Sequence, residues 1–146
     1  MKRKIYVLLL TVTCLLSMPT MAKGDLHMTE LQAEMLRLIS TPDREKFIQV
    51  TEQLKAECHK QGDERLFYIA WSNQSTYEAT HQNYMKAEEI ADQIAEYAGD
   101  QNSHWGNYIV LHTKAVNALQ KQDYDAAEEG FLIARSEERR VGKECR

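Results

Sequence analysis

The feature that most constrains the fold is a recurrence of amphipathic helical hairpins along the chain. The second helix of each expected hairpin begins near Asp43, Tyr84 and Tyr124, so the starts are 41 and 40 residues apart. A near-constant period of this length is typical of stacked repeats, in which each hairpin leaves an apolar face for its neighbour to cover. We therefore expect an all-α fold of about three antiparallel helical hairpins over residues 23–134.

Residue usage in this segment supports helices and gives no support to strands. Pro42 is its only proline, helix-forming residues dominate, and no run alternates between apolar and polar residues. Thr29 is expected to cap the first helix and Thr41 the second, with Pro42 in its first turn. Gly62 suits the left-handed cap that ends the second helix, and Gly99 is expected to close the fourth.

The first 22 residues have the pattern of a secretory signal peptide. Basic residues at 2–4 precede an apolar run over 5–16, and Ala22 is the small residue that a signal peptidase needs. The run is shorter than the roughly 20 residues that span a bilayer. An uncleaved anchor or a buried helix is the alternative, and Thr13 makes Cys14 a poor site for lipidation. We expect cleavage near Ala22 and an exported, periplasmic protein.

The last residues, RSEERRVGKECR, do not continue the amphipathic pattern that ends at Ala134. Their back-translation, read in frame, resembles a widely used short-read sequencing adapter. We therefore expect residues 135–146 to be an adapter-derived artefact that is disordered, and the repeat region to be truncated near Ala134. A natural basic tail is the alternative.

Without the leader and the tail, the charge balance is strongly acidic. Residues 23–134 carry 10 basic and 19 acidic side chains, a net formal charge of −9. Such a segment lacks the basic footprint that nucleic-acid binding needs, and it is a poor match for anionic lipid surfaces. We therefore expect no nucleic-acid partner, and membrane attachment only through sequence downstream of the repeat region.

Catalytic and cofactor-binding motifs are not evident in the sequence. It contains no HExxH, no paired CxxC and no glycine-rich phosphate loop. Cys58 beside His59 suggests a thiolate nucleophile, but Cys58 falls on the apolar stripe of its helix, which favours a buried structural thiol. A calcium site on one acidic helix face is less favoured than a solvated surface; that face comprises Glu88, Glu89, Asp92 and Glu96. We expect no catalytic residue, no cofactor and no metal.

Two segments resemble the second helix of the tetratricopeptide repeat. DYDAAEEGFLIA (123–134) and NYMKAEEIADQIA (83–95) place small or aromatic residues at the family's signature positions, namely Ala127, Phe131, Ala134, Ala87 and Ala91. First-helix positions match at Trp71 and Ser75, and Ala115 falls where the family packs its two helices closely. The period of ~40 residues departs from the typical ~34, Ile94 replaces a small residue, and the terminating proline is absent. The resemblance implies a right-handed superhelix, with Trp71 packed in the core.

The same resemblance implies a non-catalytic module that binds a protein or a peptide on the concave face of its first helices. The candidate contacts are polar or aromatic residues expected on those helices: Asn73, Tyr77, Asn107, Tyr108 and His112. The exported segment also resembles the extracytoplasmic N-terminus of repeat-containing sensor histidine kinases of Bacteroidetes-type bacteria. That likeness implies a sensor fragment in two-component signalling, whereas a stand-alone periplasmic repeat adaptor is the alternative and an exported enzyme a third. The ligand, the oligomeric state and the number of missing repeats stay open.

Overall fold

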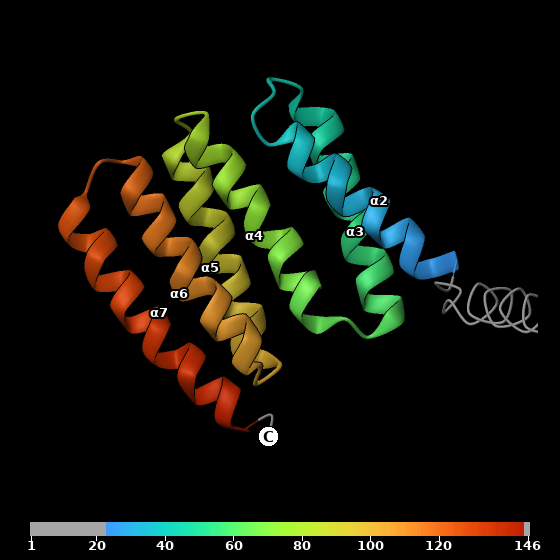
Figure 1. Cartoon of the computed structure of the whole chain (residues 1–146). Coiled ribbons are helices and arrows are strands. Elements are labelled where there is room, and N and C mark those ends of the chain that lie inside the picture. Colours follow the sequence, from blue (N-terminus) through green and yellow to red (C-terminus); the bar gives the residue numbers. More distant parts are fainter. Residues whose placement is uncertain (1–22, 145–146) are drawn as a thin grey trace, which may run out of the picture.

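The computed structural model describes residues 23–144, and this part of the chain is helical almost throughout (Figure 1). Its elements are α2 (Lys23–Leu38), α3 (Arg44–Gln61), α4 (Glu64–Thr80), α5 (Tyr84–Asp100), α6 (His104–Gln120) and α7 (Tyr124–Glu144). No strand occurs within the described residues. The all-α prediction is therefore confirmed, whereas the expected signal peptide lies outside the described residues.

Four turns between consecutive helices share one geometry and recur every 20 residues. A residue with positive φ lies at each turn, and these residues are Gly62 (74°), Gln82 (63°), Asn102 (52°) and Gln122 (65°). In the second of these turns, the N–H of Gln82 donates to the carbonyl of Ala79 and that of Asn83 donates to the carbonyl of Glu78. The other three turns repeat this pair of bonds, which satisfies carbonyls left open at a helix end.

Each of these turns is followed by a residue that starts the next helix. The side chains of Asp63 and Ser103 accept hydrogen bonds from the backbone N–H groups of Leu66 (2.9 Å) and Gly106 (2.8 Å). Such bonds satisfy donors that would otherwise be open in the first turn. The left-handed cap expected at Gly62 is thus confirmed.

Three expected helix boundaries are wrong. Thr29 lies inside α2, where its hydroxyl donates to the carbonyl of Asp25, one turn back. Thr41 bonds back to Leu38 in the same way, so Asp43 caps α3 instead. Gly99 lies within α5, and Asn102 takes the left-handed position at that turn. A threonine hydroxyl can satisfy the preceding turn as readily as the following one.

The end of α7 corrects another expectation. Residues 135–144 continue the helix, although their sequence predicts a disordered tail. The segment is rich in Glu and Arg, which are good helix formers. Glu137 and Arg140 form an ion pair one turn apart, and Arg140 also lies 3.3 Å from the ring of His104 in α6.

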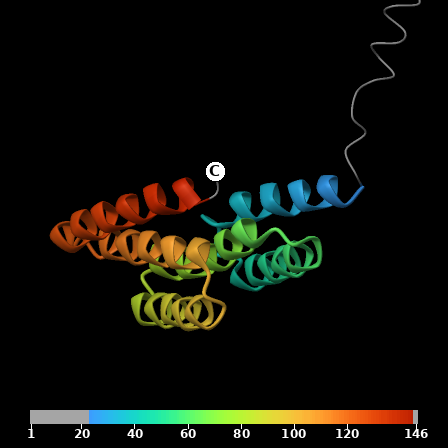
Figure 2. The ribbon, with the colours of Figure 1, turned by 90° about the horizontal axis from the view of Figure 1, so that it is seen from below.

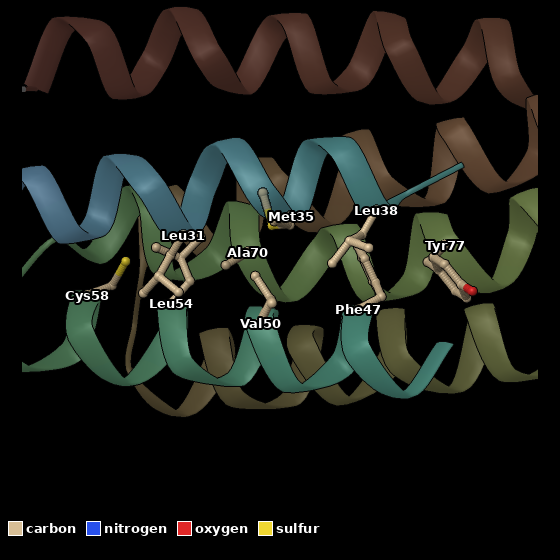
Figure 3. Close-up of a cluster of buried hydrophobic side chains, with 9 residues drawn as sticks. All are labelled: Leu31, Met35, Leu38, Phe47, Val50, Leu54, Cys58, Ala70 and Tyr77. Atoms are coloured by element: carbon tan, nitrogen blue, oxygen red, sulfur yellow. The ribbon is translucent and has the colours of Figure 1, made fainter. Parts of the chain in front are cut away.

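Two clusters of buried side chains hold the helices together. The first joins α2, α3 and α4 (Figure 3) and comprises Leu31, Met35, Leu38, Phe47, Val50, Leu54, Cys58, Ala70 and Tyr77. The second joins α4, α5 and α6 and comprises Tyr68, Ile90, Ile94, Ala98, Ile109 and Val110. Because α4 contributes to both clusters, it links the N-terminal hairpin to the rest of the molecule.

Small residues let the later helices approach closely. A Cβ added at Gly106 would lie 2.5 Å from the Cβ of Ala98, so α5 and α6 leave no room for a side chain there. A Cβ at Gly130 of α7 would lie 2.9 Å from the Cβ of Ala115 in α6. Ala115, which falls at a close-packing position of the resembled repeat, therefore lies at a close contact between α6 and α7.

Viewed from below, the helices lie in layers (Figure 2). Helices α2 and α7 lie on one side, α4 and α6 lie between them, and α3 and α5 lie on the opposite side. Helices α4 and α6 therefore form the middle layer of this arrangement.

Candidate functional site

A groove of about 360 Å³ runs between α4 and α6 and is the candidate site. We call it the α4–α6 groove, and its lining residues are Arg65, Ile69, Ser72, Asn73, Thr76, Tyr108, Ile109, His112, Thr113 and Val116. It opens on the side where α2 and α7 lie, because Arg65 also borders an adjoining hollow that Asp25 and Met28 of α2 line. The two helices place these residues together because each presents them at intervals of three or four positions.

Several polar groups on the groove wall bond back to their own helix. The amide nitrogen of Asn73 and the hydroxyl of Ser72 both donate to the carbonyl of Ile69, at 3.0 and 2.9 Å. The hydroxyl of Thr113 donates to the carbonyl of Ile109 at 2.7 Å. These bonds leave the carbonyl oxygen of the Asn73 side chain as an acceptor at the groove, because a side-chain amide has separate donor and acceptor ends.

Aromatic rings continue from the groove towards α7. Tyr108 lies 6.1 Å from Trp105 and 6.3 Å from His112, measured between ring centroids. His112 in turn lies 5.4 Å from Phe131 of α7 between ring centroids, with the two ring planes inclined at 66°. This row of rings supplies flat, apolar faces beside the polar wall of α4, a combination that suits protein or peptide ligands.

The charge of the groove differs from that of the rest of the chain. None of its lining residues is acidic, and Arg65 is its only lysine or arginine. The guanidinium of Arg65 lies 5.0 Å from the centroid of the Trp105 ring, which holds it at the groove by a cation–π contact. Burial raises the pKa of Tyr108, and nearby Glu138 raises it further, so the phenol stays neutral and can donate a hydrogen bond.

The structure brings three of the five predicted contacts together. Asn73, Tyr108 and His112 line the α4–α6 groove, whereas Asn107 is half-buried outside its lining. Tyr77 is a correction, because its side chain is buried at 2% exposure. Its ring stacks on Phe47, and its hydroxyl donates to the backbone carbonyl that precedes Pro42, at 2.8 Å. The connection between α2 and α3 covers this position, so Tyr77 cannot contact a ligand.

The sequence does not predict seven of the groove residues, namely Arg65, Ile69, Thr76, Ser72, Ile109, Thr113 and Val116. Their signal is the helical spacing itself, because 65, 69, 73 and 76 lie on one face of α4. Extending the face from Asn73 by steps of three and four would have found the first three.

Trp71 lies on another face of α4 and is half-buried. Its ring packs 5.9 Å from that of Phe67 and 5.6 Å from that of Tyr97. Lys55 of α3 places its ammonium nitrogen 4.5 Å from the centroid of the same ring. Trp71 therefore joins α3, α4 and α5 and takes no part in the α4–α6 groove.

Cys58 and the acidic face of α5 are accounted for by burial and by ion pairs in the part of the chain that the structure describes. Cys58 is fully buried, and this burial raises the pKa of its thiol to about 11, so it stays protonated at neutral pH. On the acidic face of α5, Asp92 pairs with Lys114 at 2.8 Å and Glu88 pairs with Lys121. Within residues 23–144, no group of three His, Cys, Asp or Glu side chains could hold a metal ion.

Helices long and apolar enough to cross a membrane do not occur among the described residues. Comparison of the chain with models of protein families, with curated proteins and with solved structures finds no match. The assignment of function therefore rests on the sequence and on the geometry of the groove.

Proposed function

We propose that this chain is a non-catalytic module that binds a protein or a peptide in the α4–α6 groove. The observation that carries the proposal is the lining of that groove, where Asn73, Tyr108 and His112 meet. The groove follows two neighbouring first helices of a repeated hairpin array, and the extended surfaces that such arrays form suit a segment of chain.

The charge of the groove supports a ligand segment that carries a carboxylate. Arg65 is the single full positive charge of its lining, and a guanidinium binds a carboxylate through two parallel hydrogen bonds. The phenol of Tyr108 and the ring of His112 add donors along the same wall. An acidic side chain of the ligand would therefore pair with Arg65, while its backbone lies along Asn73.

The proposed architecture is a right-handed, tetratricopeptide-like superhelix. It is supported by the turns that recur every 20 residues and by the close helix approaches at Gly106 and Gly130. In such a stack each hairpin contacts only its neighbours, so a continuous groove forms along one side.

The proposed setting is the periplasm, with the module serving as the N-terminal sensor region of a histidine kinase. Support comes from the leader-like residues 1–22 and from the sequence resemblance described above. The alternative is a stand-alone periplasmic adaptor. Expression with the leader intact, followed by fractionation, tests the compartment: we expect the product in the periplasmic fraction with an N-terminus near Lys23, and a cytoplasmic product of full length would contradict export.

Selection of peptides from a random display library on the purified protein tests the binding function. We expect enriched peptides that contain an acidic residue and whose affinity falls about tenfold in Arg65→Gln and His112→Ala, since central contacts commonly contribute more than 1 kcal/mol. Both side chains are exposed, so the fold should persist. The matched control is Lys86→Gln on α5, which removes one positive charge away from the groove. Equal affinity of all variants would contradict the proposal.

A further inference from the structure

A second surface lies between α3 and α5, on the side of the molecule opposite α2 and α7 (Figure 2). Its centre is the half-buried ring of Tyr97, with Phe67 at 5.9 Å and Trp71 at 5.6 Å between ring centroids. We call these three side chains the aromatic triad. They come from α4 and α5, so the packing of the two helices fixes their relative positions.

Two hollows flank Tyr97, and each combines aromatic rings with acidic side chains. The first has a volume of about 320 Å³ and is bordered by Phe67 together with Asp63 and Glu64. The second has a volume of about 340 Å³ and is bordered by Trp71 together with Glu96 and Asp100. Neither lining contains a lysine or an arginine. Each hollow therefore places aromatic rings beside carboxylates, an environment that favours a cation.

The chain itself already places a cation against this cluster. The ammonium nitrogen of Lys55 lies 4.5 Å from the centroid of the Trp71 ring and 6.0 Å from that of Phe67. Its side chain is only 15% exposed and pairs with Glu52 at 3.0 Å. The triad is thus shown to accept a positive charge on the side towards α3, and the two hollows lie beside that contact.

We propose that this surface docks a basic segment of a partner protein, with one arginine or lysine side chain in each hollow and the ring of Tyr97 between them. Charge complementarity selects this occupant, because the four acidic side chains at the rim have no basic counterpart in the hollow linings. Arginine suits the site best, since a guanidinium stacks on a ring while it bonds a carboxylate. The surface is separate from the α4–α6 groove, so one module can hold two different segments.

Tryptophan fluorescence provides a local probe of this docking. The chain has two tryptophans, and Trp105→Phe leaves Trp71 as the only reporter. The probe is a blocked peptide of glycines with two arginines, and its comparison peptide has citrulline in place of each arginine. Citrulline has nearly the same shape but no charge. We expect saturable quenching of Trp71 by the arginine peptide and none by the citrulline peptide. Equal responses to both, or no response to either, would overturn the proposal.

Charge-matched variants locate the binding. The double variant Glu96→Gln with Asp100→Asn should lower the affinity for the arginine peptide about fivefold, because each exposed ion pair contributes up to about 1 kcal/mol. Glu128→Gln with Glu129→Gln removes two exposed carboxylates from α7 and should leave the affinity unchanged. An equal loss of affinity in both double variants would show that the peptide responds to net charge alone, and it would contradict the proposal. So would a loss in His112→Ala, which would place the peptide in the α4–α6 groove.

Discussion

At the scale of single residues, buried polar contacts join the N-terminal hairpin to the centre of the molecule. Glu78 of α4 is 2% exposed and accepts hydrogen bonds from Arg44 at 2.7 Å and from Asn83 at 2.9 Å. It thereby ties the start of α3 to the turn after α4. Tyr77, its neighbour, bonds the connection between α2 and α3. This pair of residues fixes how the first hairpin sits on the second.

Glu78→Ala should lower the free energy of unfolding by about 2 kcal/mol, since it removes the hydrogen bonds that Arg44 and Asn83 donate to a buried carboxylate. The loss stays below the value for a fully buried ion pair, because the half-exposed Arg44 can be rehydrated. Chemical denaturation measures it. The control Glu89→Ala removes an exposed carboxylate that pairs with Lys86, and it should cost less than about 0.5 kcal/mol. Similar losses for both variants would contradict the role of Glu78.

Cys58 should behave as a structural thiol. Its pKa of about 11 keeps it protonated at neutral pH, and its burial excludes reagents. We expect iodoacetamide to label Cys58 in the denatured protein and to leave it unlabelled in the native protein at pH 8, as read by peptide mapping in a mass spectrometer. Rapid native labelling would instead indicate an accessible, activated thiolate.

At the scale of elements, the sequence predicts that helices exist better than it predicts where they begin. The spacing of apolar residues predicts all six described helices. Thr29 and Thr41 nevertheless give wrong helix starts, because their hydroxyls donate to carbonyls earlier in the chain and do not cap the helix that follows. The positive φ of Gln82 and Gln122 has no glycine to signal it. These turns are indicated instead by the residue that follows each of them, which begins the next helix and recurs every 20 residues. Tertiary packing enforces this interval, and helix propensity alone does not reveal it.

Two glycines inside helices should respond in opposite directions to alanine. Gly99 has no atom within 4 Å of an added Cβ, so Gly99→Ala should stabilise the protein by about 0.5–1 kcal/mol through helix propensity. At Gly106 the added Cβ would lie 2.6 Å from the ring of Tyr68, so Gly106→Ala should destabilise by about 1–3 kcal/mol. Thermal unfolding compares the two. An increase in Tm for both would contradict the close packing of α5 and α6.

The last turns of α7 should contribute little stability even though they are helical. Ser136, Glu138, Arg139 and Arg140 are exposed, so they bury little surface. Removal of residues 136–146 should change the free energy of unfolding by less than about 1 kcal/mol, which is the value of a few surface ion pairs. Arg140→Ala separates the contact with His104 from the rest. A drop of several degrees in Tm on removal would show that the segment packs as part of the core.

At the scale of the whole molecule, repetition of one hairpin creates two different surfaces. The α4–α6 groove carries Arg65 as its only full charge, whereas the hollows around Tyr97 are acidic. The sequence alone predicts Asn73, Tyr108 and His112 because polar and aromatic residues on first helices are conspicuous. It misassigns Tyr77, because the loop that covers it comes from 36 residues earlier in the chain. Such a long-range contact leaves no local pattern.

The most direct test of the account is a map of where a display-selected peptide binds. Backbone amide shifts of the ¹⁵N-labelled protein, followed during titration with the peptide, report the contact surface residue by residue. We expect the largest shifts on the groove face of α4 and α6, around Asn73, Tyr108 and His112, and we expect Arg65→Gln to weaken them. Shifts confined to α3 and α5, or spread without focus over all helices, would contradict the claim that the α4–α6 groove is the binding site.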